Sequence, residues 1–511
     1  MEDPQQPLTH EPDLGDTING APFYKKKSFI IAIVSIVVAI IAVILIIIFV
    51  GGKKEEEKDE NKYSFKAIYE IKSENENVNL INILPHKDQN YSQITEIKIN
   101  GEKINPTKNY TFASKGNYTV LFLLDINNAD SFSKMFEGIK NLVSINFYQK
   151  FNTEKIKYMD YIFRNCESLS FINISYFNTE NAIAMNHIFA SCTSLTSINL
   201  QKLNFNNLQT IEYMFYNSAL ISADFSNLDF PNLTQMNYMF MDCNNLENVN
   251  FYSMKIPNLV EMHNLFLRCS SIISINLSNI DARKVENMAS MFSGCESLSY
   301  LNLKNFKTEN VKNIYNIFNG CSSLTSLDIS SFDTKNVETM EKMFYDCIYL
   351  TSLDFSNFDT SNTKSTREMF SNCESLQYLN IESFNTINVQ NMNRMFSHCS
   401  SLISLNVSNF DTSAVTSMQS MFSHCITLTS LDLSSFTNDK VIFAEDLFFN
   451  ASKLTYIDIR KFKGHENKFN KMFNGLPDNE GKIVINIDAM DIVKNLIPQN
   501  WSIEIINITD F

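Results

Sequence analysis

Cysteines recur at a fixed interval, a pattern that raises the question of metal binding or disulfide chemistry. All ten stand three residues after a recurring phenylalanine, one per repeat, from Cys166 to Cys425. A metal site needs ligands that converge, as in C-x-x-C pairs, and a disulfide needs two cysteines of suitable geometry. This spacing therefore favours small buried side chains stacked on one another, with disulfides between neighbouring repeats as the alternative.

A second ladder consists of asparagine and aspartate. One of the two occupies the same position in thirteen repeats: Asn146, Asn173, Asn199, Asp224, Asn250, Asn276, Asn302, Asp328, Asp354, Asn380, Asn406, Asp432 and Asp458. A calcium site would need several converging carboxylates, and eight of the thirteen side chains are neutral amides. We favour a ladder hydrogen-bonded from amide to amide or to backbone, with calcium as the alternative, and we predict no metal and no cofactor.

Three tyrosines stand two residues before this ladder, at a position where most repeats carry serine. Tyr300, Tyr378 and Tyr456 occupy it in every third repeat. Exposed tyrosine is a typical anchor residue at interfaces, so these side chains indicate binding rather than spacing. The candidate ligand-binding residues are Tyr300, Tyr378, Tyr456, Asn302, Asp328, Asp354 and Asn380.

Catalytic chemistry finds no support in the sequence. The seven histidines are scattered, and His398 and His424 directly precede Cys399 and Cys425, which is not a nucleophile–base arrangement. No phosphate-binding or dinucleotide-binding fingerprint is present. We predict that the protein is not an enzyme and takes no small-molecule substrate.

The elements that position these ladders come from the repeat itself. The phenylalanine recurs from Phe136 to Phe473 in steps of 25 to 27 residues, which is typical of a solenoid. Leu324, Leu327 and Ile329 form L-x-x-L-x-L, the strand segment of a leucine-rich repeat. Asp333-Thr334 would cap a short helix with Val337, Met340, Met343 and Phe344 on one face. We therefore predict an α/β solenoid, a leucine-rich-repeat-like right-handed coil of about 13 rungs of about 26 residues, each a parallel strand plus a short helix.

Methionine follows the same period. Seventeen of the 21 methionines occupy two positions on the predicted helix face, as Met340 and Met343 do. Core packing explains this spacing better than an exposed binding groove does.

An apolar segment near the N-terminus predicts a membrane anchor. Residues 1–28 form a polar tail, and Phe29–Val50 follows without a charge. These 22 residues would rise about 33 Å as a helix, enough to cross a bilayer core of about 30 Å. A charged linker covers residues 51–62. We expect a single-pass plasma-membrane protein with a cytoplasmic N-terminus and extracellular repeats.

The remaining segments flank the repeats. Residues 63–130 contain strand-like runs separated by turns and predict a small β-rich cap domain. The repeats then cover residues 131–476, and residues 477–511 predict a C-terminal cap of two strands around a short helix. A solenoid needs such caps because its end turns would otherwise expose apolar surface.

The repeat motif is C-x-S-L-x-x-L-[ND]-[LIFV]-S-x-F-[DN]-T-x-x-V-x-x-M-x-x-M-F, shown best by residues 295–370. It resembles the BspA-like leucine-rich-repeat surface proteins over about two thirds of the chain. Phe332 and its equivalents depart from common leucine-rich repeats, which carry Asn or Cys at that corner. The resemblance implies surface display and adhesion.

Two functions follow as expectations. The first is adhesion to, or recognition of, an extracellular protein or glycan through the open strand face. The second is a structural coat or membrane spacer without a specific ligand. The net charge of −14 argues against nucleic acid as a partner.

Overall fold

The computed structural model describes residues 62–82, 94–126, 129–463 and 471–506, all within one compact unit, Asn61–Phe511. In these ranges no helix combines the length and the apolar character that crossing a membrane requires. The predicted span Phe29–Val50, the tail before it and the linker up to residue 61 lie outside the described residues.

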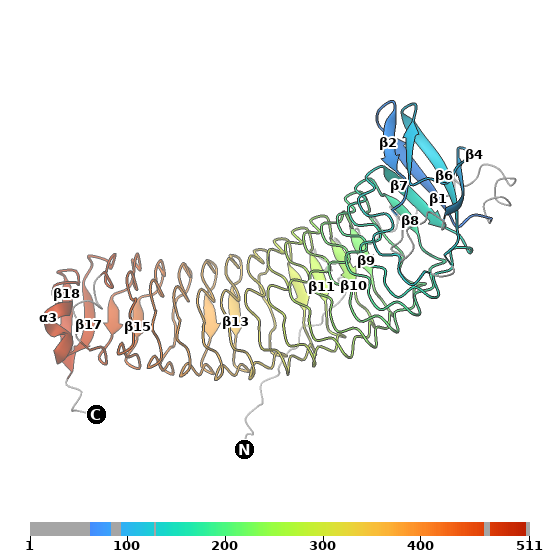
Figure 1. The fold of residues 1–511 in the computed structure, drawn as a ribbon. Helices are drawn as coiled ribbons and strands as arrows, with labels where there is room; N and C mark the ends of the chain where they lie inside the picture. Colours follow the sequence, from blue (N-terminus) through green and yellow to red (C-terminus); the bar gives the residue numbers. More distant parts are fainter. Residues whose placement is uncertain (1–61, 83–93, 127–128, 464–470, 507–511) are drawn as a thin grey trace, which may run out of the picture. The chain divides into compact units, whose positions relative to one another are not determined.

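The repeats form a solenoid whose turns are joined by short parallel strands (Figure 1). β11 (Ser274–Asn276) and β12 (Tyr300–Asn302) pair in register one repeat apart, so each turn places the same position beside the next. The other strands of this series are β7 (Leu142–Phe147), β8 (Phe171–Asn173), β9 (Ser222–Asp224), β10 (Asn248–Asn250), β13 (Ser352–Asp354), β14 (Tyr378–Asn380), β15 (Ser430–Asp432) and β16 (Tyr456–Asp458). The predicted solenoid of about 13 turns is confirmed.

The predicted helix in each turn is wrong. In the described residues the helical elements are η2 (Ile487–Ala489) and α3 (Met490–Val493), both near the C-terminus. Where helices were expected, successive turns are linked by single parallel bridges, as at Thr339 and Ser365. Backbone N–H groups there donate to the next turn, as Phe344 does to the Met369 carbonyl at 2.9 Å.

The spacing of the turns explains why a helix cannot form there. The recurring phenylalanine rings stack at centroid distances such as 5.2 Å between Phe318 and Phe344 and 6.1 Å between Phe344 and Phe370. An α-helix with its side chains is about 10 Å wide, so one helix per turn would force neighbouring turns apart. The segment instead forms overlapping tight turns, with residues such as Lys342 and Asp346 at positive φ.

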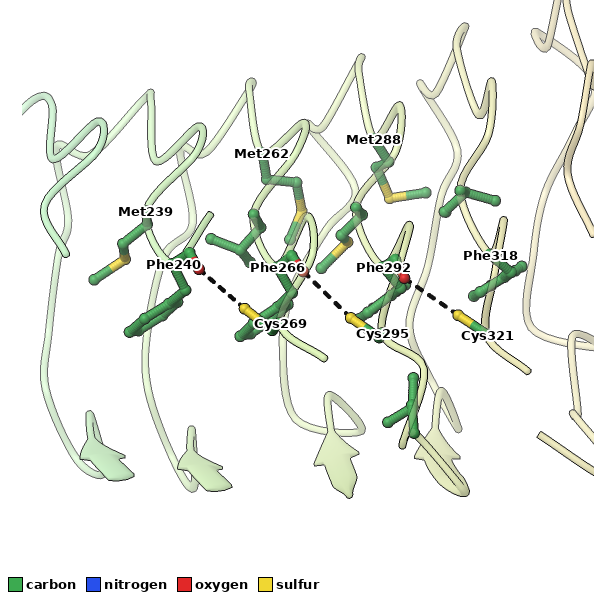
Figure 2. Close-up of a cluster of buried hydrophobic side chains, with 14 of the residues drawn as sticks. Met239, Phe240, Met262, Phe266, Cys269, Met288, Phe292, Cys295, Phe318 and Cys321 are labelled. Carbon is green, nitrogen blue, oxygen red and sulfur yellow. Dashed lines mark hydrogen bonds between the residues drawn. The ribbon is translucent and has the colours of Figure 1, made fainter. Parts of the chain in front are cut away.

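The core between the strand side and this turn side is a set of stacked ladders (Figure 2). Val337, Met340, Met343 and Phe344 are each at most 1% exposed, so the buried stripe lies where the sequence predicted it. All seventeen periodic methionines are likewise buried. The expected helix cap Thr334 instead donates from Oγ1 to the carbonyl of Asp359 in the next turn, at 3.0 Å.

The first turn is covered by β strands. They are β1 (Phe65–Ile71), β2 (Glu76–Asn79), β3 (Ile94–Ile99), β4 (Glu102–Ile104), β5 (Asn109–Phe112) and β6 (Gly116–Leu124). β1 pairs antiparallel with β7, so these strands extend the first strand layer of the solenoid. The Phe65 ring contacts the rings of Phe136, Phe147 and Phe151 and thereby closes the end of the core.

The last turn is covered by two further parallel strands. β17 (Gly481–Asn486) pairs with β16, and β18 (Trp501–Ile506) pairs with β17. Trp501 is 6% exposed and lies against Gly481, where an added Cβ would come within 2.4 Å of the indole ring. A glycine is therefore required at this position.

Candidate functional site

The open strand face consists of the outward side chains of the short parallel strands. In β13 the middle residue Leu353 is buried, whereas Ser352 and Asp354 are exposed. We call the first residue of each such triplet the leading position and the third residue the ladder position. The ladder position carries the Asn/Asp series, and the leading position carries the three predicted tyrosines.

The ladder residues hold the corner that follows each strand. Twelve of the thirteen, all except Asn146, accept a hydrogen bond at Oδ1 from the backbone N–H two residues later, at 2.9–3.2 Å. A short side chain with a carbonyl or carboxylate oxygen makes this contact more strongly than a serine or threonine hydroxyl does, which is consistent with Asn or Asp at every repeat.

The ladder also links neighbouring turns directly. Asn250 donates from Nδ2 to Asp224 Oδ1 at 3.0 Å, and Asn380 donates in the same way to Asp354 at 2.9 Å. The hydrogen-bonded interpretation is confirmed, both amide to amide, as between Asn173 and Asn146 at 2.7 Å, and amide to backbone. Within the described part of the chain, no three His, Cys, Asp or Glu side chains are grouped so that they could hold a metal ion.

The four predicted ligand-binding residues of the ladder all take part in these corners. Asn302, Asp328, Asp354 and Asn380 each accept the N–H two residues later. The side-chain and backbone hydrogen bonds from Ser330 hold the pKa of Asp328 below its ordinary value. These four side chains therefore hold the backbone corner after each strand, whether or not a ligand binds.

The three predicted tyrosines are not equivalent. Tyr300 and Tyr378 stand on the open strand face with 59% and 60% of their surface exposed. Tyr456 is only partly exposed, and the residue beside it in β17 is the long side chain Lys482, whereas Tyr300 and Tyr378 lie beside Ser274 and Ser352. Burial, followed by the negative charge of Asp458, raises its pKa. The structure thus leaves two of the three tyrosines mostly exposed on the open strand face.

A hollow of about 270 Å³ crosses β10, β11 and β12 on the open strand face. It is lined by Asn248, Val249, Asn250, Phe251, Tyr252, Ser274, Ile275, Asn276, Asn279 and Tyr300. Tyr252 is 63% exposed, and the sequence did not single it out. Tyr252 stands two residues after ladder residue Asn250, at a position where the other repeats carry mainly serine. The replacement of serine by a large aromatic residue there was the signal that could have identified it.

The cysteine ladder belongs to the core and not to this site. All ten cysteines are free and buried, so the disulfide alternative is not realised. Each Sγ donates to the carbonyl of the preceding turn's phenylalanine, as Cys295 does to Phe266 at 3.2 Å (Figure 2). Burial raises the pKa of these thiols, that of Cys243 to about 11 and that of Cys425 to about 12.

Several solved structures share a low level of similarity with the chain. A leucine-rich-repeat protein of Leptospira interrogans is 13% identical, with 70% of this chain and 91% of that chain covered and a TM-score of 0.23. The Toll–Spätzle complex of Drosophila is 13% identical over 70% of this chain and 59% of that chain, with a TM-score of 0.18. The functional domain of InlJ from Listeria monocytogenes, described as including a cysteine ladder, is 13% identical over 68% and 69%, with a TM-score of 0.13. These scores are too low to argue from.

No curated protein matches the chain. One family model does, and it is described as a Mycoplasma protein of unknown function, DUF285. It matches residues 130–252, 260–379 and 365–484, which together cover more than half of the sequence and coincide with the repeats. The BspA-like name is not part of that description and remains a resemblance. The chain belongs to the DUF285 repeat family.

Proposed function

We propose that this protein is a recognition protein of the cell surface, anchored in the plasma membrane by Phe29–Val50, whose open strand face binds an extracellular partner. The N-terminus would be cytoplasmic and the repeats extracellular. The uninterrupted apolar run supports the anchor. Lysines lie on both sides of the run, so a protease experiment on intact cells is needed to test the orientation.

The observation that carries this proposal is the interruption of a regular polar surface by exposed aromatic side chains. Most leading positions hold serine, whereas Tyr300 and Tyr378 project from the same position with more than half of their surface exposed. Large tyrosine side chains left in water favour an interface, because they supply contact area and a hydroxyl group at little entropic cost.

We also propose that the protein acts without catalysis. The ten cysteines, which would be the obvious nucleophiles, are buried, and burial raises their pKa values. A cysteine nucleophile needs an accessible thiolate, so these side chains are suited to packing and not to reaction. The net charge of −14 would repel nucleic acid.

Binding at this face should be weak per molecule and strengthened by many copies. The polar side chains of the ladder already use one oxygen each within the fold, which leaves few groups for a partner. Such a surface gives modest affinity at a single site, and display of many copies on one cell compensates through multivalency.

The test is capture of cells that display the full-length chain on surfaces coated with mucin or with mixed extracellular-matrix proteins. Replacing Tyr300, Tyr378 and Tyr456 together by serine should reduce capture at equal surface expression. A matched change on the turn side, Lys335→Ser with Glu338→Ser, should leave capture intact.

The alternative function is a spacer or coat without a specific ligand. A spacer predicts equal capture by the wild type and by both sets of variants. Loss of capture in the turn-side variant alone would place the contact on the other face and contradict the proposal.

A further inference from the structure

The hollow across β10, β11 and β12 has a chemical character that differs from the rest of the open strand face. Two exposed tyrosines border it, one at a leading position (Tyr300) and one two residues after a ladder position (Tyr252). Because both side chains line the same hollow, a small molecule bound in it could touch both rings.

The floor between the tyrosines is rich in amide groups. Asn248, Asn276 and Asn279 are exposed and line the hollow. Asn276 Oδ1 accepts the Ser278 N–H at 3.0 Å, but among the described residues nothing accepts from its Nδ2 group. The side chains of Asn248 and Asn279 likewise form no hydrogen bond within the described part of the protein. Carboxamides that offer both donors and an acceptor are therefore available to a ligand.

None of the ten lining residues carries a charge. A carboxylate, sulfate or phosphate group would find no Lys or Arg among them, and a cationic ligand would find no Asp or Glu. The ligand that matches this lining is neutral, rich in hydroxyl groups and equipped with an apolar C–H surface that can lie against a tyrosine ring.

We propose that the hollow binds a neutral saccharide of one or two sugar rings. The volume of about 270 Å³ lies near the lower end of ligand pockets, which span roughly 300–1,000 Å³, and this size suits so small a ligand. The two tyrosine rings would stack on C–H faces of the sugar, while the carboxamides of Asn248, Asn276 and Asn279 would bind its hydroxyl groups. This inference rests on the proposed recognition function of the open strand face and names its ligand class.

The repeat supplies a matched control for this proposal. Tyr378 occupies the leading position of β14 as Tyr300 does in β12, and the two side chains are equally exposed. Three repeats after Tyr252, however, the corresponding residue is Ser330. Tyr378 therefore lacks the second aromatic border, and its replacement should not affect saccharide binding in the hollow.

The experiment uses the full-length chain purified without glycoside detergents. Binding of lactose, cellobiose, maltose and chitobiose is measured by saturation-transfer NMR, with 3′-sialyllactose as an anionic probe. We expect at least one neutral disaccharide to bind with a dissociation constant on the order of 1 mM. Tyr252→Ser and Tyr300→Ser should each weaken it about tenfold, whereas Tyr378→Ser should not change it.

Two further variants keep the test decisive if a tyrosine substitution disturbs folding, which circular dichroism would reveal. Tyr300→Phe retains the ring and should still bind. Asn276→Asp retains the oxygen that accepts the Ser278 N–H but adds a negative charge to the floor, and it should weaken binding of the neutral sugar.

The proposal is overturned if no neutral disaccharide binds at about 10 mM, a concentration well above the expected dissociation constant. It is equally overturned if Tyr378→Ser weakens binding as much as Tyr300→Ser, or if 3′-sialyllactose binds in preference to lactose. If no saccharide binds but the triple tyrosine variant still reduces capture of cells, the proposed recognition function is supported and only the proposed ligand class is wrong.

Discussion

Replacing Asp354 by alanine should loosen one corner of the solenoid by a predictable amount. Asp354 Oδ1 accepts hydrogen bonds from the Ser356 N–H at 3.0 Å and from Asn380 Nδ2 at 2.9 Å. The side chain is exposed, so each bond contributes near the lower end of the usual range. Loss of both should destabilise the corner by about 1–2 kcal/mol, which corresponds to a roughly 5- to 30-fold increase in local opening.

Hydrogen exchange measures this opening locally, which suits a solenoid whose turns contact only their neighbours. The amide of Ser356 should exchange roughly 5- to 30-fold faster in Asp354→Ala than in the wild type. Asp354→Asn keeps the accepting oxygen and should change the free energy of opening by less than about 0.5 kcal/mol. Ser352→Ala lies on the same strand, where the described residues give its hydroxyl no hydrogen bond, and it should be equally mild.

The reasoning fails if Asp354→Ala leaves exchange at Ser356 unchanged. It also fails if Ser352→Ala has the same effect as Asp354→Ala, since the loss would then come from the strand and not from the corner. Equal acceleration in a distant turn would show that the turns unfold together and would contradict the local account.

Three further predictions concern the thiols, the pH dependence and the topology. All ten cysteines should react with an alkylating reagent after denaturation without reductant and should resist it in the native protein. Cys347→Ser should cost about 1–3 kcal/mol of stability, because a hydroxyl enters the core. Disulfides found by mass spectrometry would contradict the prediction of free thiols. Burial, followed by the positive charge of Arg164, lowers the pKa of His187 to about 4, so the unfolded chain binds a proton more readily. Stability should therefore fall as pH falls from about 6.5 to about 4, and His187→Tyr should remove part of that loss in thermal unfolding; an equal loss in the variant would refute the assignment. Protease added to intact cells should remove the chain beyond Gly52, and protection of the repeats would exclude their display outside the cell.

Much of the fold follows from the spacing of particular residues. The recurring phenylalanine predicts the stacked turns, and the L-x-x-L-x-L segment predicts a strand in each turn, as β13 shows. The Asn/Asp ladder was correctly interpreted as hydrogen-bonded, because its invariance over thirteen repeats matches a short acceptor needed in each turn. These predictions succeed because they depend on contacts within one turn or between identical positions of adjacent turns.

The helix prediction failed for a geometric reason. Val337, Met340, Met343 and Phe344 form the same buried stripe whether the backbone is helical or a series of tight turns. Only the distance between turns separates the two, since rings 5.2 Å apart leave no room for a helix about 10 Å wide. That distance is a property of the stack and is not encoded in the pattern of a single repeat.

The site was predicted in part for a similar reason. Tyr300 and Tyr378 are exposed at the leading position, as the sequence predicted. Tyr252 joins Tyr300 only because two different positions from turns two repeats apart border one hollow. Tyr456 differs because its neighbour is Lys482 of the C-terminal strand β17 and not the serine of a regular repeat, and that neighbour cannot be read from the repeat period.

The most direct test of the central claim is hydroxyl-radical footprinting of the full-length chain on cells, before and after attachment to a mucin-coated surface. If the open strand face binds the partner, Tyr252, Tyr300 and Tyr378 should lose reactivity on attachment. Phe443, which is 51% exposed and lies on the turn side, should keep its reactivity. Protection of Phe443 with unchanged tyrosines would contradict the account.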